Sequence, residues 1–167
     1  MLGQAPSEIG KAGIMLSMKI HFICRGNVLR SLIAETYLQS LKLPNVTVSS
    51  SGTNVDLTNP TEREYFANTI ALFKRHNLER YAKDTSHQLT QERANDQDIT
   101  ICMNQRVVDE AASLVTLPEG TINWDIVDIG EGHRTVPEDI RIYEEEIFRE
   151  IAIRVDELVK KLSLDKL

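Results

Sequence analysis

Apolar and polar residues follow two alternating patterns along the chain, one typical of strands and the other of helices. Four short apolar runs predict strands, at residues 19–24, 46–50, 99–103 and 121–126. Apolar residues spaced three or four apart predict helices over residues 33–41, 65–73, 107–115 and 143–162, with a short helix near 89–94. Since the two patterns alternate, we expect an α/β fold: a single doubly wound domain with a four-stranded parallel sheet flanked by helices on both faces.

Polar residues mark where two of these helices begin. Asn59 is a candidate N-cap, followed by Pro60 at the first helical position and Glu62 at the third, a pattern typical of a helix start. Asn104 is a second candidate cap, directly after the third predicted strand. Residues 128–136 lack a helical pattern, so we expect them to form a loop before the last helix.

The first seventeen residues differ from the rest of the chain. They contain neither an early basic cluster nor a continuous apolar stretch, so we do not expect a signal peptide. No apolar run approaches the length of about eighteen residues that a membrane span needs. We expect residues 1–17 to form a flexible N-terminal extension, residues 18–167 to form the domain, and the protein to be cytoplasmic with no membrane partner.

The composition narrows the classes of partner and site. The chain has 167 residues, enough for one domain to bury a core without disulfide or metal staples. It carries 19 Lys and Arg against 25 Asp and Glu, a net charge of -6, which argues against nucleic acid as a partner because phosphate-driven binding needs a basic face. Only two cysteines occur, Cys24 and Cys102, and neither has a metal-ligand spacing. We therefore expect no metal, no cofactor and a reducing compartment.

The segment from Cys24 to Ser31 combines the parts of an oxyanion site. Cys24 ends a predicted strand, and Arg30 lies six residues on, where a helix begins. Between them, Gly26 and Asn27 tolerate left-handed backbone angles, so the loop can curl until its N–H groups point inward at an anion. The positive end of the helix dipole adds to this field, and the guanidinium offers a bidentate fork to two phosphate oxygens.

Cys24 is the residue of this segment that can perform covalent chemistry. An anion-binding environment favours its thiolate, which is the nucleophilic form of cysteine, and the Ser31 hydroxyl can donate to the same sulfur. The amides of Arg25, Val28 and Leu29 complete the expected cradle for the anion. Phosphate and sulfate are therefore the expected ligands.

The segment resembles the signature of the low-molecular-weight protein-tyrosine phosphatases and the related thioredoxin-coupled arsenate reductases. Five residues match that signature in order: Cys24, Gly26, Asn27, Arg30 and Ser31. The resemblance continues downstream through Ser51-Gly52-Thr53, Asn59-Pro60, Ser86-His87-Gln88-Leu89 and the run that ends in Cys102-Met103. It implies a metal-independent phosphomonoester hydrolase that acts through a phosphocysteine intermediate, with Cys24 as the nucleophile and Arg30 as the phosphate-binding cation.

The resemblance also implies a general acid and supporting hydrogen bonds. The family's acid lies in a loop after the fourth strand, beyond a tryptophan. Trp124 and the residues after it align with that stretch and put Asp128 on the acid, with Asp125 as the competing candidate. Three residues correspond to polar side chains that hold the phosphate-binding loop: Asn27, Ser31 and Ser51.

The leaving group is less defined than the phosphate site. Tyrosine-specific relatives carry aromatic residues after the acid, and no aromatic residue directly follows Asp128. Arg25, His133 and Arg134 are candidates for contacts with a more polar leaving group. A phosphorylated protein and a small phosphomonoester both remain open as substrates.

Two other functions remain open. An arsenate reductase would need further cysteines, and residues 75–97 contain none, so an external thiol would have to resolve the arsenate adduct. Cys102 lies in a predicted core strand, where burial favours the protonated thiol. The other alternative is a catalytically weak module that binds phosphate or a phosphoprotein, because Ile129 replaces the proline that follows the family's acid.

Overall fold

A four-stranded parallel sheet forms the centre of the computed structural model, which describes residues 9–10, 13–14 and 17–164. Its strands are β3 (Met18–Cys24), β4 (Val46–Gly52), β5 (Ile99–Cys102) and β6 (Ile122–Asn123). They lie in the order β4-β3-β5-β6, and each neighbouring pair is parallel. The predicted α/β class and its four-stranded parallel sheet are confirmed.

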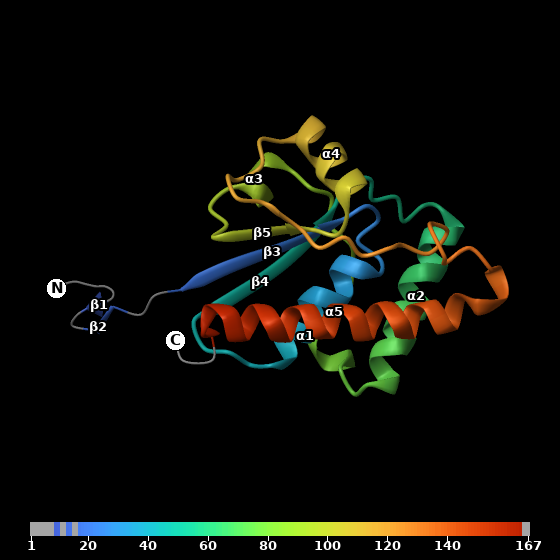
Figure 1. The fold of residues 1–167 in the computed structure, drawn as a ribbon, viewed down its shortest axis with the longest axis horizontal. Coiled ribbons are helices and arrows are strands. Elements are labelled where there is room, and N and C mark those ends of the chain that lie inside the picture. The colour runs from blue at the N-terminus through green and yellow to red at the C-terminus, as the bar shows by residue number, and fades with distance from the viewer. Residues whose placement is uncertain (1–8, 11–12, 15–16, 165–167) are drawn as a thin grey trace.

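Helices cover both faces of this sheet (Figure 1). They are α1 (Arg30–Ser40), α2 (Pro60–Arg75), α3 (Gln91–Ala94), α4 (Gln105–Leu114) and α5 (Ile140–Leu162), with short 3-10 turns at Glu79–Tyr81 and Pro137–Asp139. α1, α2 and α5 lie on one face, and α3 and α4 lie on the other. Among the described residues, no helix combines the length and the apolar character that crossing a membrane requires.

Two very short strands precede the main sheet. β1 (Ile9–Gly10) and β2 (Gly13–Ile14) pair antiparallel as a separate two-stranded sheet. The predicted extension over residues 1–17 otherwise falls mostly outside the described residues. The division into an extension and a domain that begins at residue 18 stays a prediction.

β3 is the central strand and it positions the site. Its full length pairs with β4, where Cys24 lies opposite Gly52, and its middle pairs with β5. The chain first passes through α1 to β4 on one side of β3, and later through α2 to β5 on the other side. This reversal creates a topological switch point at the carboxyl end of β3, the usual place for a ligand in such sheets. Cys24 is the last residue of that strand.

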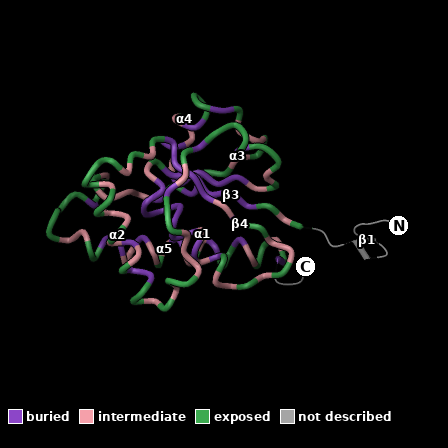
Figure 2. The backbone as a smooth tube through the Cα atoms, turned by 180° about the vertical axis from the view of Figure 1, so that it is seen from behind, coloured by how far each residue is buried: buried purple, intermediate pink, exposed green. Residues whose placement is uncertain are grey.

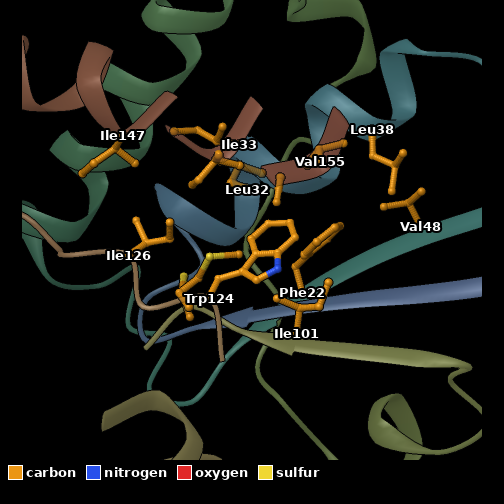
Figure 3. Close-up of a cluster of buried hydrophobic side chains, with 14 of the residues drawn as sticks. Phe22, Leu32, Ile33, Leu38, Val48, Ile101, Trp124, Ile126, Ile147 and Val155 are labelled. Atoms are coloured by element: carbon orange, nitrogen blue, oxygen red, sulfur yellow. The ribbon is translucent and has the colours of Figure 1, made fainter. Parts of the chain in front are cut away.

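Side-chain alternation along β3 divides the core between the two faces. Phe22 and Cys24 belong to the larger cluster, under α1, α2 and α5, while Ile23 belongs to the smaller one, under α3 and α4. Figure 3 labels ten side chains of the larger cluster: Phe22, Leu32, Ile33, Leu38, Val48, Ile101, Trp124, Ile126, Ile147 and Val155. Figure 2 shows buried backbone along β3 and α1, so the loop that joins them is attached to the core at both ends.

The fourth strand is shorter than the apolar pattern predicts. β6 ends at Asn123 because Asp125 adopts a left-handed backbone with φ of 56°. Backbone hydrogen bonds nevertheless continue on either side of this residue, from Trp124 N to Cys102 O at 3.0 Å and from Ile126 N to Met103 O at 2.7 Å. The kink therefore keeps the apolar side chains in the core while turning the Asp125 side chain outward.

The predicted helix starts are confirmed, with one difference at Glu62. Asn59 Oδ1 accepts a hydrogen bond from Thr61 N at 2.9 Å, and Asn104 caps α4 in a similar way. Such a cap is worth about 1 kcal/mol. A full capping box would have Glu62 accept from the Asn59 amide, but that amide donates to Asp56 O at 3.2 Å. The Glu62 carboxylate is therefore left for another role.

His21 is a buried polar residue on the α3 and α4 side of β3. Its Nδ1 lies 2.6 Å from Ser49 Oγ and its Nε2 lies 2.8 Å from Ser51 Oγ, so two β4 hydroxyls satisfy the neutral ring. Burial, together with the nearby charges of Lys83 and Arg93, lowers the pKa of His21 from 6.5 to about 4. Between pH 6.5 and about 4, the ring is therefore neutral in the folded protein but protonated in the unfolded chain.

We expect this histidine to make folding stability depend on pH. Between pH 6.5 and 4 the unfolded chain binds a proton that folded His21 rejects, so stability falls as the pH falls. The expected loss between pH 7 and pH 5 is about 2 kcal/mol. Urea unfolding at both values measures it, and the loss should shrink in His21→Gln but not in His133→Gln, which changes an exposed histidine. Equal losses in both variants would contradict the assignment.

Candidate active site

The loop after β3 curls tightly because the end of β4 holds its backbone. Thr53 N donates to Cys24 O at 3.0 Å, and Asn54 N donates to Arg25 O at 2.8 Å. A Cβ atom on Gly52 would lie 2.5 Å from Arg25 O and 2.9 Å from Asn27 N, closer than real Cβ atoms approach. Glycine at position 52 is therefore required by the space between the strand and the loop.

The Cys24 sulfur lies at the base of this loop with two donors directed at it. Asn27 N donates to Cys24 Sγ at 3.2 Å, and Ser31 Oγ lies 2.9 Å from the same sulfur. The Ser31 hydroxyl already accepts a hydrogen bond from Asn27 Nδ2 at 2.6 Å, so its own hydrogen is free to point at Cys24. Both contacts favour a negative charge on the sulfur.

Asn27 is the residue that fixes the loop conformation. Its φ of 55° is the left-handed angle that the sequence predicts for this position. Besides Ser31, its Nδ2 donates to Ser50 Oγ at 2.9 Å, and its Oδ1 accepts from His87 N at 2.9 Å. Its carbonyl accepts from Ser86 Oγ at 2.8 Å. The fully buried side chain therefore ties together three segments that are distant in the sequence.

The supporting role predicted for Ser51 falls to its neighbour Ser50. Successive side chains of a strand point to opposite faces, so only one of the two serines can reach Asn27. Ser50 faces Asn27, and Ser51 lies within hydrogen-bonding distance of His21 on the other face. The sequence motif is correct, but the assignment along the strand is shifted by one residue.

Lys83 and Glu35 extend this network, because both form hydrogen bonds with Ser50. Neither residue was predicted from the sequence. Ser50 Oγ donates to Glu35 Oε1 at 2.5 Å, while Lys83 Nζ donates to Ser50 O at 2.9 Å and lies 3.4 Å from Glu35 Oε1. Burial lowers the pKa of Lys83, although Glu35 acts in the opposite direction. Glu35 lies on α1 and Lys83 lies in a later segment, so the fold brings them together and no sequence spacing indicates the pair.

Arg30 reaches from the first turn of α1 to the loop that carries the predicted acid. Its buried guanidinium donates to Asp128 Oδ2 at 2.9 Å and to Ile126 O at 3.1 Å. Asp128 Oδ1 accepts from Ile129 N at 2.8 Å. Asp128 therefore lies beside Arg30, the predicted phosphate-binding cation, whereas Asp125 is exposed. The geometry favours Asp128 over Asp125 as the candidate acid.

The start of α1 is open to an anion. Leu29 is its N-cap residue and provides no side-chain hydrogen bond, so no side chain caps the first amides of the helix. These amides carry the positive end of the helix dipole. Arg25, Gly26, Val28, Leu29 and Arg30 all line a cavity of about 250 Å³ that also contains Cys24. The predicted phosphate-binding residues thus surround one cavity, with Asn27 and Ser31 holding its base.

Gly26 contributes space rather than an unusual backbone angle. Among the described residues it is absent from those with positive φ, so the left-handed turn rests on Asn27 alone. A Cβ atom on Gly26 would overlap the Glu62 carboxylate. The missing side chain therefore lets an acidic group of α2 approach the loop.

Two residues of α2, Glu62 and Tyr65, also line the cavity. Neither was predicted from the sequence as a site residue. They lie three residues apart on one helix face and both line the cavity. Burial raises the pKa of Glu62, as does the charge of Asp128, while Arg25 lowers it. Burial and the charges of Asp128 and Glu62 also raise the pKa of Tyr65. The cavity has an aromatic wall after all, but α2 supplies it rather than the loop after Asp128.

Two residues considered for the leaving group lie elsewhere. Arg134 is buried and donates to Val127 O at 2.7 Å, with ion pairs of 3.4 Å to Glu146 and Glu150 on α5. It anchors the acid loop to α5 instead of facing the cavity. His133 is exposed and is not among the cavity residues.

The second cysteine is separated from the first by the sheet. Cys102 is fully buried and packs in the cluster under α3 and α4, whereas Cys24 belongs to the cluster under α1, α2 and α5. Burial, and then the nearby Cys24, raises the pKa of Cys102 to about 12. Within the described part of the chain, no three Asp, Glu, His or Cys side chains are grouped so that they could hold a metal ion.

Comparisons with known proteins identify the family of the chain and structures with the same fold. The family model described as low molecular weight phosphotyrosine protein phosphatase matches residues 19–167. No curated protein sequence matches the chain.

Solved structures with the same fold include phosphatases and an arsenate reductase. The chain is similar to Vibrio vulnificus Wzb in complex with benzylphosphonate, with 21% identity and a TM-score of 0.60 over 84% of this chain and 98% of that one. It is similar to the Streptococcus pyogenes low molecular weight protein tyrosine phosphatase, with 20% identity and a TM-score of 0.64 over 87% and 93%. The Corynebacterium glutamicum thioredoxin-dependent arsenate reductase gives 21% identity and a TM-score of 0.61 over 95% and 66%.

We expect Asn27→Gly to separate the backbone angle from the hydrogen bonds. Glycine tolerates a φ of 55° but removes the side-chain contacts to Ser31, Ser50 and His87. The protein should fold with a loss of about 2 to 4 kcal/mol, and its affinity for inorganic phosphate should fall at least tenfold. Urea unfolding and calorimetric titration measure these effects. Unchanged phosphate binding would show that the network does not maintain the loop.

Proposed function

Since the chain belongs to the low molecular weight phosphotyrosine protein phosphatase family, we propose that it is a cysteine-dependent phosphomonoester hydrolase that works through a phosphocysteine intermediate. One observation supports this most strongly: Asn27 N and Ser31 Oγ are both directed at Cys24 Sγ, within a cavity that Arg30 also lines. The proposal needs no metal or organic cofactor. Phosphorylated proteins and small phosphomonoesters are the substrates it covers, and phosphate and sulfate should compete with them.

In the first step the Cys24 thiolate attacks the phosphorus atom. A sulfur–phosphorus bond forms, the bond between phosphorus and the leaving oxygen breaks, and Asp128 gives its proton to that oxygen. Arg30 and the amides of residues 25–31 stabilise the negative charge spread over the three equatorial oxygens. The buried position of Arg30 supports this role, because a desolvated guanidinium binds an anion more strongly than an exposed one.

In the second step water hydrolyses the phosphocysteine. Asp128, now a carboxylate, takes a proton from the water as it attacks phosphorus, and the sulfur–phosphorus bond breaks. Phosphate leaves and the Cys24 thiolate is restored. The Asn27 amide and the Ser31 hydroxyl support this step too, because they stabilise the departing sulfur anion.

Substrate binding must change the contact between Arg30 and Asp128. Arg30 Nη2 and Asp128 Oδ2 are 2.9 Å apart, so Asp128 occupies a guanidinium donor that a phosphate dianion needs. The dianion therefore competes with Asp128 for the guanidinium and displaces it. The released Asp128 carboxylate must take up a proton from solvent before it can protonate the leaving oxygen. The contact thus keeps the acid and the phosphate-binding cation together before substrate arrives.

Arsenate reduction is a weaker candidate for this chain. It needs a thiol that attacks the Cys24–arsenate adduct, and Cys102 is the sole other cysteine. Burial on the other face of the sheet and a pKa of about 12 make Cys102 unsuitable as that thiol. An external thiol would have to do the work. A module that only binds phosphate is also less favoured, because a carboxyl group that could act as the acid, Asp128, lines the same cavity as Cys24 and Arg30.

We propose that the domain formed by residues 18–167 carries this activity in the cytoplasm. The cysteine usage supports a reducing compartment, because the proposed nucleophile must stay a free thiol.

A small aryl phosphate tests the proposed function. Cys24→Ser and Arg30→Ala should each lower turnover at least about a thousandfold, because each removes a group that acts directly on the transferring phosphoryl group. Cys24→Ser should still bind phosphate, which calorimetry can measure. Adding arsenate and a thiol reductant to the wild type tests the alternative. Binding of phosphate without any turnover by the wild type would contradict the proposal.

A second prediction concerns the acid. We expect Asp128→Asn to reduce turnover about 100- to 10,000-fold for an unactivated phenyl or alkyl phosphate, and much less for a nitrophenyl phosphate, whose leaving group needs no proton. Steady-state rates for both substrates test this. Asp125→Asn is the matched control and should leave both rates unchanged, because Asp125 is exposed and lies outside the cavity. The opposite result would move the acid role to Asp125.

A further inference from the structure

Glu62 and Tyr65 are cavity residues without a role in the proposed phosphoryl transfer. Both project from one face of α2 into the cavity that contains Cys24. Each is partly buried. Asp128 lines the same cavity, so a leaving group attached to a phosphate at Cys24 would lie within reach of both Asp128 and this pair of side chains.

Glu62 differs from the other charged residues that line the cavity. Arg30 pairs with Asp128 at 2.9 Å, Arg106 pairs with Glu131 at 3.2 Å, and Arg25 pairs with Glu110 at 3.4 Å. Within the described residues, Glu62 has neither an ion pair nor a hydrogen bond to its carboxylate. Helix capping does not use it either, because the Asn59 amide donates to Asp56 O.

The carboxylate of Glu62 is held close to the phosphate-binding loop. It fills the space that a side chain on Gly26 would occupy. An acid whose purpose was only to stabilise the start of α2 could point into solvent, since the helix dipole acts at an exposed position as well. Here the side chain folds over the loop and becomes partly buried, which costs solvation that a partner of opposite charge would offset.

The charge balance of the cavity indicates what that partner is. Three arginines and three carboxylates line it, so their charges cancel before the thiolate and the phosphate dianion are added. Both of these additions are negative. A substrate that brings its own positive charge close to Glu62 would restore the balance, and the face of Tyr65 offers a further attraction for a cation.

We propose that Glu62 and Tyr65 form a leaving-group subsite for a positive charge, an ammonium or guanidinium group carried a few bonds beyond the phosphorylated oxygen. This inference rests on the proposed phosphatase function and gives it a substrate preference. Glu62 supplies the charge complement, Tyr65 supplies an aromatic surface, and Gly26 supplies the space that lets the carboxylate reach the substrate.

Two phosphate esters test this subsite. Both have an alkylphenol leaving group, and the side chain of that phenol carries a positive charge in one ester and a negative charge in the other. O-phosphotyramine carries an ammonium group, and the phosphate ester of 3-(4-hydroxyphenyl)propanoate carries a carboxylate at a similar distance from an alkylphenol oxygen. We expect the wild type to have a kcat/KM about tenfold or more in favour of the cationic ester at pH 7. Glu62→Gln should remove most of this preference, and Glu62→Lys should reverse it.

Glu64→Gln is the matched control. It neutralises an exposed glutamate of the same helix that lies outside the cavity, so it changes the net charge equally and should leave the preference unchanged. Equal effects of the Glu62 and Glu64 variants would show that only the overall charge matters. A wild type that hydrolyses both esters with equal kcat/KM, or that prefers the anionic ester, would overturn the inference.

Binding to the Cys24→Ser protein separates this inference from the proposed function. That variant should not turn the esters over, so calorimetry can measure the affinity of each with Glu62 intact and with Glu62→Gln added. A preference for the cationic ester that disappears with Glu62→Gln supports the subsite even if the wild type fails to hydrolyse either ester. Equal affinities for the two esters, or no binding of either, would overturn it.

Discussion

The buried side chain of Asn27 is the contact on which the rest of the site depends. It stabilises a left-handed turn that brings the loop amides and the Cys24 sulfur to the same side. It also lies in the middle of a chain of polar contacts that runs from Glu35 through Ser50 to Asn27, and from there through Ser31 to Cys24. Both hydroxyls accept from Asn27, so their own hydrogens are free to point outward, toward Glu35 at one end and Cys24 at the other. The loop geometry and the hydrogen bonds to the Cys24 sulfur are therefore set by one residue.

The fold could be predicted from the sequence because the apolar runs of its strands and the helical spacing of apolar residues in its helices are both clear over short segments. Residues 19–24 and 46–50 are β3 and the larger part of β4, and the caps at Asn59 and Asn104 mark real helix starts. The fourth strand was overestimated, because a left-handed Asp125 interrupts a run whose apolar side chains still reach the core. The spacing of apolar residues indicates which side chains are buried. It cannot indicate a backbone kink that leaves those side chains buried.

The site was predictable where a motif is contiguous and less so where the fold brings distant segments together. Cys24 and Arg30 lie at the two ends of one loop and Asp128 follows a recognisable tryptophan, so the sequence could predict that all three line one site. Glu62 and Tyr65 enter the same cavity from α2 because Gly26 leaves room, a consequence of packing that spacing alone cannot express. Arg134 was a candidate for a leaving-group contact, but it does not line the cavity. It connects the loop that contains Asp128 to α5 through ion pairs with Glu146 and Glu150.

The placement of the two cysteines on opposite faces of the sheet has a consequence for how the protein ages under oxidative stress. A sulfenic acid formed on Cys24 is chemically rescued when a neighbouring thiol captures it as a disulfide. Cys102 cannot serve as that thiol, because it is buried on the opposite face of the sheet and burial raises its pKa to about 12. Reactivation then depends on small thiols from the surroundings, and whatever they fail to intercept proceeds to irreversible sulfinic acid. The lifetime of the Cys24 thiol is thus determined by the redox state of its environment rather than by the fold.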